Sequence, residues 1–218
     1  NITLPFKERA FQMSEMKSER AKIARSVNTF KLEKGLLYGD NTDGVGLISD
    51  LTRNLQMTLK GKKILLLGAG GAARGVIGPL LEQNPSMLFI LNRTKEKAEQ
   101  LKIEFEPLGP IKVFVAEKHP ELSFDLILNS TSLGLKGEPF EFHQSLIHPE
   151  TVCYDMLYRL SDNSFTPFMQ FARQSGAKQV YSGLGMLVEQ AAEAFYIWFG
   201  IRPETSELLN LSGLPESL

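Results

Sequence analysis

The fold is decided by residues 62–75, which read Lys-Lys-Ile-Leu-Leu-Leu-Gly-Ala-Gly-Gly-Ala-Ala-Arg-Gly. A short apolar run ends there in closely spaced glycines, and an alanine-rich stretch with apolar residues at helical spacing follows. Gly68, Gly70 and Ala73 fit the Gly-x-Gly-x-x-Gly/Ala pattern of a strand–turn–helix unit that binds a dinucleotide. The first glycine permits the turn, the second lets the backbone approach a pyrophosphate, and the small third residue lets the helix pack on the strand. The predicted cofactor-binding residues of this turn are Gly68, Ala69, Gly70, Gly71, Ala72 and Ala73.

A purely structural turn and a P-loop are the alternatives for the same residues. The P-loop is excluded, because no Gly-Lys-Ser/Thr follows the glycines. The helix that follows offers free N–H groups to an anion at its N-terminus. This context favours a dinucleotide site over a structural turn.

The end of the next apolar run indicates which dinucleotide binds. Residues 87–91 are apolar, and Asn92, Arg93 and Thr94 follow them. An NAD site usually places Asp or Glu here, about 20 residues past the glycines, to hold the ribose 2′-hydroxyl. A guanidinium suits a 2′-phosphate instead, so Arg93 predicts NADP. The alternative is that Arg93 and the lysines after it form a solvated helix start.

Apolar runs and helical patterns alternate through the middle of the chain. Strands are predicted at 64–67, 88–91, 112–115, 126–128, 152–155 and 179–181, and helices at 73–82, 95–105 and 167–174. Strands separated by helices indicate a mostly parallel sheet. We therefore predict an α/β protein whose residues 43–180 form a Rossmann-like, doubly wound nucleotide-binding domain.

The two ends of the chain, residues 1–42 and 181–218, are predicted to form a second, smaller α/β lobe that holds the substrate. Its predicted helices lie at 7–16, 19–24 and 186–199, and its predicted hairpin lies at 29–38. Apolar residues recur at helical spacing in the last of these helices, which is typical of a helix that packs into a core.

The composition excludes several classes of function. The chain has 218 residues and a formal net charge of −1, so it lacks the charge surplus that nucleic-acid or membrane-surface binding uses. It contains no apolar run of membrane-spanning length and no secretory signal pattern. Cys153 is the single cysteine, and the three histidines show no metal-ligand spacing. We therefore expect a cytoplasmic protein without a metal site.

Three polar stretches lie outside the predicted nucleotide turn. Residues 1–7 read Asn-Ile-Thr-Leu-Pro-Phe-Lys, residues 27–29 read Val-Asn-Thr, and residues 39–46 read Gly-Asp-Asn-Thr-Asp-Gly-Val-Gly. In a strand Asn1 and Thr3 would share one face, and the proline would end it. Each stretch alone also fits a helix start, a turn or a helix cap, so residue types alone do not join them into one site.

Together with the glycine turn, these stretches resemble shikimate dehydrogenase in their order and spacing. The matching stretches are residues 1–8, 27–29, 39–46, 68–75, 92–94, 154–158 and 183–191. Seven ordered motifs are far more specific than one glycine turn. The resemblance implies the reversible, NADPH-dependent reduction of the ketone of 3-dehydroshikimate to the alcohol of shikimate, a step of aromatic amino-acid biosynthesis on the way to chorismate.

The resemblance also implies roles for individual residues. Lys7 matches the catalytic lysine, and Asp43 matches its acidic partner. The substrate-binding matches are Asn1, Thr3, Asn28, Tyr158 and Gln190, the adenosine-phosphate matches are Asn92, Arg93 and Thr94, and the nicotinamide matches are Met156 and Gly183. Hydride delivery to a carbonyl builds negative charge on its oxygen, which an adjacent ammonium stabilises before it supplies a proton.

The chain departs from the family at its start. The family carries some tens of residues before the Asn-x-Thr-x-Pro stretch, including a Ser-x-Ser pair for the substrate carboxylate, whereas this sequence opens with Asn1 of that stretch. We therefore expect a fragment or processed product, monomeric or homodimeric, that binds NADP and oxidises shikimate very weakly or not at all. An exposed sheet edge would favour pairing or aggregation, or disorder near residues 1–38.

Three alternatives stay open from the sequence. A quinate/shikimate dehydrogenase of broader specificity would share every motif. A non-catalytic NADP-binding protein would keep the glycine turn without the chemistry. Another Rossmann dehydrogenase, of the kind that acts on amino acids, would explain residues 62–94 but not the polar stretches at 1–7 and 39–46.

Overall fold

The computed structural model describes residues 1–3, 5–115, 122–133, 143–158 and 165–211. Its larger sheet has six parallel strands in the order β6-β5-β4-β7-β8-β9. The strands are Ile111–Val113 (β6), Met87–Leu91 (β5), Lys63–Leu67 (β4), Leu126–Asn129 (β7), Val152–Asp155 (β8) and Gln179–Ser182 (β9). The chain fills the sheet outward from β4, first to one edge and then to the other. This is the doubly wound topology that the sequence predicts.

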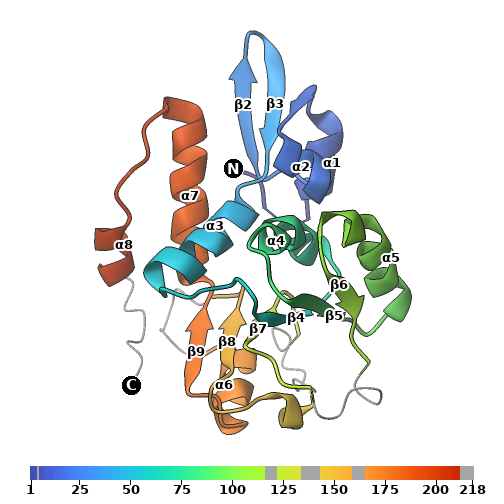
Figure 1. The fold of residues 1–218 in the computed structure, drawn as a ribbon. Coiled ribbons are helices and arrows are strands. Elements are labelled where there is room, and N and C mark those ends of the chain that lie inside the picture. Colours follow the sequence, from blue (N-terminus) through green and yellow to red (C-terminus); the bar gives the residue numbers. More distant parts are fainter. Residues whose placement is uncertain (4, 116–121, 134–142, 159–164, 212–218) are drawn as a thin grey trace.

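Successive residues of the central strands are buried on opposite faces of this sheet. Ile64 and Leu66 of β4 pack on one face, under helices α4 (Gly71–Glu82) and α5 (Lys95–Phe105). Leu65 packs on the other face, with α6 (Pro167–Gln174). Both faces are apolar because helices cover both, as parallel sheets require. Figure 1 shows α4 and α6 on opposite sides of the strands.

A second sheet has three strands in the order β1-β3-β2. It comprises Met16–Lys17 (β1), Leu36–Asp40 (β3) and Thr29–Glu33 (β2), and helices α1 (Lys7–Met13) and α2 (Glu19–Ala24) precede its hairpin. The predicted hairpin is confirmed: Lys34 and Gly35 join β2 to β3, and both have positive φ, of 52° and 81°. Two-residue turns of this kind match the twist of paired strands.

Two helices connect the regions of the two sheets. Helix α3 (Asp43–Ser49) continues into a π-helical turn, Asp50–Asn54, and α7 (Leu184–Phe199) packs against α3. Figure 1 shows α3 between the hairpin and the large sheet, and α7 running from beside the hairpin down to β9. The described residues also form 3-10 turns at Glu106–Leu108 and Gln144–Leu146 and helix α8 (Ser206–Leu211). The proposed domain boundaries after residues 42 and 180 stay a prediction.

Several predicted elements differ from the observed ones. The helix predicted at 7–16 ends at Met13, because Ser14 is extended and the N–H of Glu15 bonds the carbonyl of Leu37 beside β1. The polar stretch at 39–46 is divided between two elements, since β3 includes Asp40 and α3 begins at Asp43. Residues 1–3 are not part of a strand, and the N–H of Ile2 bonds the carbonyl of Asn28.

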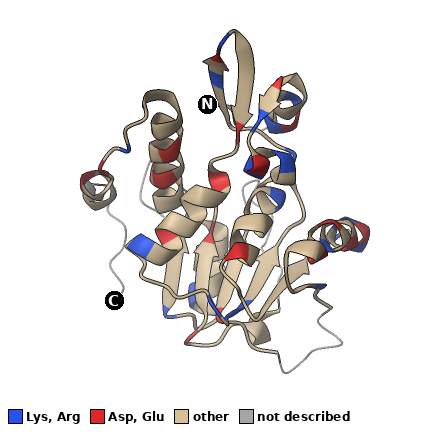
Figure 2. Cartoon of the chain, turned by 45° about the horizontal axis from the view of Figure 1, so that its top comes forward, with Lys and Arg blue, Asp and Glu red and all other residues tan. Residues whose placement is uncertain are grey.

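Charge is spread over the outer elements rather than gathered on one face. Figure 2 shows Lys and Arg interspersed with Asp and Glu, most densely on α5, while the strands of the large sheet are largely uncharged. In the described part of the chain no helix is long and apolar enough to cross a membrane.

Candidate active site

Lys7 and Asp43 form an ion pair although 36 residues separate them in the sequence. Lys7 is the first residue of α1 and Asp43 the first residue of α3. The Lys7 Nζ lies 2.6 Å from Asp43 Oδ2, and the two side chains are 20% and 10% exposed. The pair is therefore held in place by the fold while part of the lysine stays open to a bound molecule.

Asn28 fixes the other carboxylate oxygen of Asp43. Its Nδ2 donates to Asp43 Oδ1 at 2.9 Å, and it also lies 2.9 Å from Thr42 Oγ1 and 3.3 Å from Gln190 Oε1. The structure thus brings four sequence-predicted residues together: Lys7, Asn28, Asp43 and Gln190. Thr42 belongs to the same cluster but was not among the predicted site residues. Its position directly before Asp43 at a helix start was the available signal.

Asn41, a second residue that the sequence analysis missed, holds the start of α3. Its Oδ1 accepts the N–H of Asp43 at 3.0 Å, and its Nδ2 donates to Ser26 Oγ at 2.7 Å. The side chain is buried. A buried amide that is satisfied at both ends fixes the backbone around it, so Asn41 sets where Asp43 begins its helix.

An ion-pair network joins this region to α7. Arg20 donates to Asp40 through Nε at 2.7 Å and through Nη2 at 2.9 Å, and its Nη1 reaches Glu193 at 2.9 Å. Arg202 bonds the other oxygen of Glu193 at 2.7 Å. The fork of Arg20 therefore ties the end of β3 to α7, which carries Gln190.

Helix α3 packs unusually close to its neighbours because two of its residues are glycines. A Cβ on Gly44 would overlap Pro79 Cγ and would lie 2.8 Å from the carbonyl oxygen of Gly75 in α4. A Cβ on Gly46 would lie 2.7 Å from Gln190 Cβ in α7. The glycines therefore bring Asp43 close to both α4 and α7. Pro79 has no N–H to bond the carbonyl of Gly75, and that carbonyl faces Gly44 instead.

Asp50, just after α3, anchors the N-terminal end of α7. It is buried, and its Oδ2 accepts the hydroxyl of Tyr154 at 2.6 Å. A Cβ on Gly185 would overlap Asp50 Oδ1, so only glycine fits there. Burial raises the pKa of Asp50, and the hydrogen bond from Tyr154 opposes that shift.

The glycine turn has the geometry that its pattern predicts. Gly68 has a φ of +107°, and a Cβ there would lie 2.7 Å from Ser130 Oγ. Gly70 and Gly71 have nothing within 4 Å of an added Cβ, so their outer side is open. Ala73 is fully buried on β4. The turn therefore fits a ligand that approaches the backbone at the N-terminus of α4.

Asn92, Arg93 and Thr94 follow β5 at the same edge of the sheet. The Nδ2 of Asn92 donates to the carbonyl of Thr94 at 2.8 Å, which holds the turn. Arg93 is exposed, and no carboxylate lies within ion-pair distance of it in the described part of the chain. Its guanidinium is therefore available to an anionic group.

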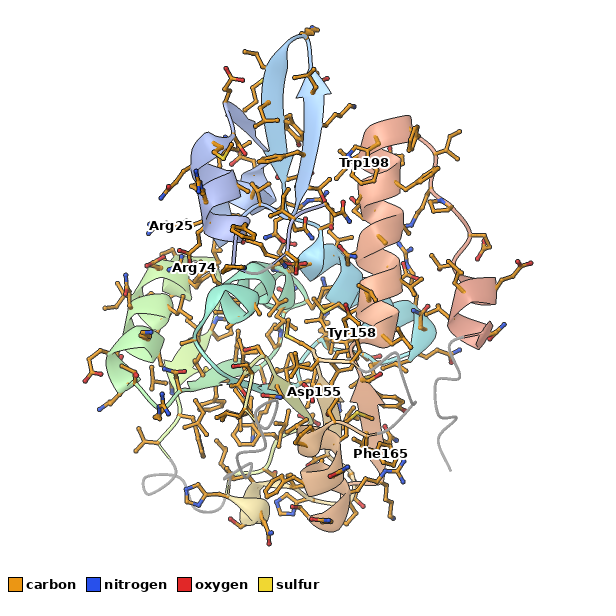
Figure 3. The ribbon with its side chains drawn as sticks, turned by 180° about the vertical axis from the view of Figure 1, so that it is seen from behind. Arg25, Arg74, Asp155, Tyr158, Phe165 and Trp198 are labelled. Atoms are coloured by element: carbon orange, nitrogen blue, oxygen red, sulfur yellow. The ribbon has the colours of Figure 1, made fainter. Side chains whose placement is uncertain are left out.

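Met156 and Gly183 meet where β8 and β9 end. A Cβ on Gly183 would overlap the carbonyl oxygen of Met156, and the N–H of Gly183 bonds the carbonyl of Leu157 at 3.0 Å. Tyr158 follows and is 39% exposed. Figure 3 shows it near the lower end of α7.

Asn1 and Thr3 lie at the margin of the cluster. Both are exposed, and the N–H of Ile2 between them bonds the carbonyl of Asn28 at 2.6 Å. The structure therefore places their segment beside Asn28 without bringing their side chains into the hydrogen-bonded cluster. Across the described ranges, no group of three or more His, Cys, Asp or Glu could hold a metal ion.

Two family models match the chain. The model described as "Shikimate / quinate 5-dehydrogenase" matches residues 50–132, and "Shikimate 5'-dehydrogenase C-terminal domain" matches residues 183–209. A shikimate dehydrogenase (NADP(+)) of Aeromonas salmonicida strain A449 is 52% identical over 211 residues, which cover 96% of this chain and 76% of that protein.

Solved structures give the same relationship. An Ael1 enzyme from Pseudomonas putida is 40% identical, with a TM-score of 0.90 over 99% of this chain and 78% of that one. A shikimate 5-dehydrogenase from Thermus thermophilus, in complex with NADP(H) and shikimate, is 33% identical, with a TM-score of 0.82 over 97% of this chain and 77% of that one.

Proposed function

This chain belongs to the shikimate dehydrogenase family, and we propose that Lys7 and Asp43 carry its reaction. The protein is an NADP-dependent oxidoreductase that interconverts 3-dehydroshikimate and shikimate in aromatic biosynthesis. The observation that supports the two residues is their 2.6 Å ion pair, which joins two segments far apart in the sequence. A pair of this kind supplies a positive charge of fixed position.

The chemistry of the proposed pair follows from where charge develops. When a ketone becomes an alcohol, negative charge grows on its oxygen, and the ammonium of Lys7 stabilises that charge and donates the proton. Asp43 keeps the ammonium in position, and Asn28 holds the far oxygen of Asp43 at 2.9 Å. NADPH, when bound, supplies the hydride. In the reverse direction Lys7 accepts the proton of the alcohol.

The residues present fit NADP at the carboxyl edge of the large sheet. The open side of Gly70 and Gly71 leaves space for a pyrophosphate at the N-terminus of α4. The exposed Arg93 at the end of β5 suits the 2′-phosphate. We assign Asn92 and Thr94 to the same turn, and Met156 and Gly183 to the nicotinamide end.

For the substrate, we retain Asn28 and Gln190 as residues that orient its hydroxyls, because both side chains reach the Asp43 cluster. Tyr158, exposed near α7, is the third. Asn1 and Thr3 remain proposals that rest on the motif alone. The division of the chain at residues 42 and 180 into substrate and nucleotide regions is part of the same proposal.

The test is a turnover assay on the 218-residue chain, followed through the absorbance of reduced nicotinamide. We expect weak oxidation of shikimate with NADP⁺, still at a higher kcat/KM than that of quinate, because the relatives are named for shikimate. Turnover of quinate at equal efficiency would favour the broader enzyme. NADPH binding without turnover of either acid would contradict the activity but keep the cofactor assignment.

Two further points remain predictions from the sequence. They are a cytoplasmic location and a monomeric or homodimeric state. Size-exclusion chromatography with light scattering decides the second, since a homodimer doubles the measured mass.

A further inference from the structure

Asp155 is a buried carboxylate that the proposed chemistry does not use. It ends β8 and is fully buried. Its Oδ1 accepts Nδ2 of Asn129 at 2.9 Å and the N–H of Leu157 at 3.1 Å, and its Oδ2 accepts the hydroxyl of Thr166. Both oxygens of this carboxylate are therefore occupied by donors from three different segments. Figure 3 shows Asp155 in the middle of the molecule, close to Tyr158.

Asn129, which Asp155 holds, also binds Thr131 in the segment that follows β7. Its Oδ1 accepts the hydroxyl of Thr131 at 2.7 Å and the N–H of the same residue at 3.1 Å. Its carbonyl accepts the N–H of Met156 at 2.9 Å. The segments that follow β7 and β8 are thus locked to each other through one amide and one carboxylate.

We propose that Asp155 is a positioning residue that fixes the Met156–Tyr158 segment and residues 130–133, which follow β7, against the nicotinamide end of the cofactor. This inference rests on the proposed function, which places Met156 and Gly183 at that end. Gly183 packs on the carbonyl of Met156, so any shift of the segment after β8 also moves the turn before α7. Asp155 touches neither substrate nor cofactor and acts through these segments.

The ionisation of Asp155 gives the proposal a measurable signature. Burial raises the pKa of Asp155 to about 6, against hydrogen bonds from Thr166, Leu157 and Asn129 that lower it. The carboxylate is therefore charged at pH ~8 and largely neutral at pH ~5. A neutral carboxyl group is a weaker acceptor than a carboxylate, so its hold on both segments weakens as the pH falls.

The other titratable groups around Asp155 are few in the described part of the chain. Burial raises the pKa of Cys153 to about 12 and raises the pKa of Tyr154 and of Tyr181, so these three stay protonated over the same pH range. Asp50, which Tyr154 contacts, also has a raised pKa. Thr166 from the start of α6 and Asn129 from β7 do not titrate. The experiment must therefore separate Asp155 from Asp50.

The test is a pH series of NADPH dissociation constants, measured by nicotinamide fluorescence, for the wild type, Asp155→Asn and Asp125→Asn. Asparagine has the shape of a neutral aspartic acid. We expect Asp155→Asn to bind NADPH about 5- to 10-fold more weakly than the wild type at pH ~8, and equally at pH ~5. The 2′-phosphate of NADPH also titrates near pH ~6, but this contribution and that of Asp50 are common to both proteins and cancel in the ratio.

Asp125→Asn is the matched control. Asp125 accepts the N–H of Lys63 at 2.8 Å and pairs with Lys62. These residues lie at the amino ends of β4 and β7, whereas Asp155 lies at the carboxyl end of β8. We expect this variant to bind NADPH like the wild type at every pH. A pH-independent ratio for Asp155→Asn, or an equal effect of Asp125→Asn, would overturn the proposal.

Thr131→Val is the second variant, for the case in which Asp155→Asn does not fold. It removes the hydroxyl that Asn129 accepts and leaves the buried carboxylate intact. The hydroxyl also accepts the N–H of Leu133 at 3.3 Å, so the variant loses two partly exposed hydrogen bonds. We expect an affinity for NADPH about 2- to 3-fold weaker as a result. An unchanged affinity for NADPH would contradict the proposal that Asp155 and Asn129 together hold residues 130–133 at the cofactor. A wild type that binds no NADPH at any pH overturns the proposed function and this inference together, a result distinct from binding that the variants do not alter.

Discussion

The glycine turn and the Lys7–Asp43 cluster are built in opposite ways. The turn uses consecutive residues, 68–73, and its chemistry is that of backbone N–H groups at a helix start. The cluster uses side chains from four separate segments. One of its hydrogen bonds joins Asn28 to Gln190, which are 162 residues apart in the sequence. A local site depends on its own residues, whereas a distributed site depends on every contact that holds its segments together.

The largest expected effect lies in the distributed site. Lys7→Ala should lower kcat for shikimate oxidation by ~10²- to 10⁴-fold, since it removes the charge and the proton donor together. Asp43→Asn should also lower it, through the lost charge beside the ammonium. The affinity for NADP⁺ should stay unchanged, which a binding titration checks.

Lys22→Ala is the control for these variants. Lys22 also pairs with a carboxylate, that of Glu19, but both side chains are exposed. Its replacement should leave kcat unchanged. Near-normal turnover of both Lys7→Ala and Asp43→Asn would show that the cluster is not catalytic.

The next effect falls on the local site. Arg93→Ala should weaken NADP⁺ binding by about 1.5–3 kcal/mol, or roughly 10- to 150-fold in Kd, since a charge-assisted contact to the phosphate is lost. NAD⁺ has no 2′-phosphate, so its affinity should not change. Calorimetric titration with both cofactors measures the difference, and equal losses for the two would contradict the assignment of Arg93.

Two glycine substitutions, one in each site, are expected to have smaller effects and to separate stability from cofactor binding. Gly44→Ala should lower the free energy of unfolding by about 1–3 kcal/mol, because the added Cβ overlaps Pro79 and the carbonyl of Gly75. Gly70→Ala should change it by less than about 0.5 kcal/mol, because the added Cβ meets open space, and should weaken NADP⁺ binding instead.

Urea unfolding and cofactor titration of both glycine variants give the two readouts. The expected result is a loss of stability without a loss of cofactor affinity for Gly44→Ala, and the reverse for Gly70→Ala. A destabilised Gly70→Ala would mean that the turn depends on packing as the cluster does.

The smallest expected effect concerns Arg74, the residue of α4 that follows the glycine turn. Arg74 donates to Glu104 at 2.6 and 3.0 Å, and Arg25 lies 3.7 Å from the same carboxylate. Figure 3 shows the two arginines near each other. The hydrogen bond from Arg74 lowers the pKa of Glu104. Glu104→Gln should therefore reduce the free energy of unfolding by at most about 1 kcal/mol at neutral pH.

The pH dependence of this effect follows from its sign. Because folding lowers the pKa of Glu104, its ion pairs stabilise the protein at neutral pH, and this stabilisation is lost as the pH falls through the folded pKa. The difference between wild type and Glu104→Gln should therefore shrink below pH ~4. Thermal unfolding at several pH values measures this difference. A difference that stays constant with pH would show that the charge of Glu104 does not stabilise the protein.

The contrast between the two sites also explains what could be predicted from sequence. The β4–turn–α4 unit, the hairpin turn at Lys34 and Gly35, and α7 follow from local periodicity and turn chemistry. Helix α3 was missed because Gly44 and Gly46 disfavour helix formation in isolation. These glycines allow close contact with α4 and α7, which no local pattern reveals.

The candidate site divides in the same manner. The glycine turn and Arg93 could be identified from residues 62–94 alone. Lys7, Asp43, Asn28 and Gln190 were identified through resemblance to a family, since nothing in their local sequence says that they meet. Asn41 and Thr42 were missed because their partners, at residues 26, 28 and 190, are brought to them only by the packing of α3.

The span between Asn28 and Gln190 has a consequence for the growing polypeptide. The strands and helix around the glycine turn have all been synthesised when residue 91 emerges, so this unit can begin to form early on the ribosome. Gln190 and the anchor of α7 follow only after β6, β7, β8 and β9 have been synthesised. The catalytic cluster is therefore completed later than the glycine turn, and a nascent chain can hold a nucleotide-binding turn before it holds a complete reaction centre.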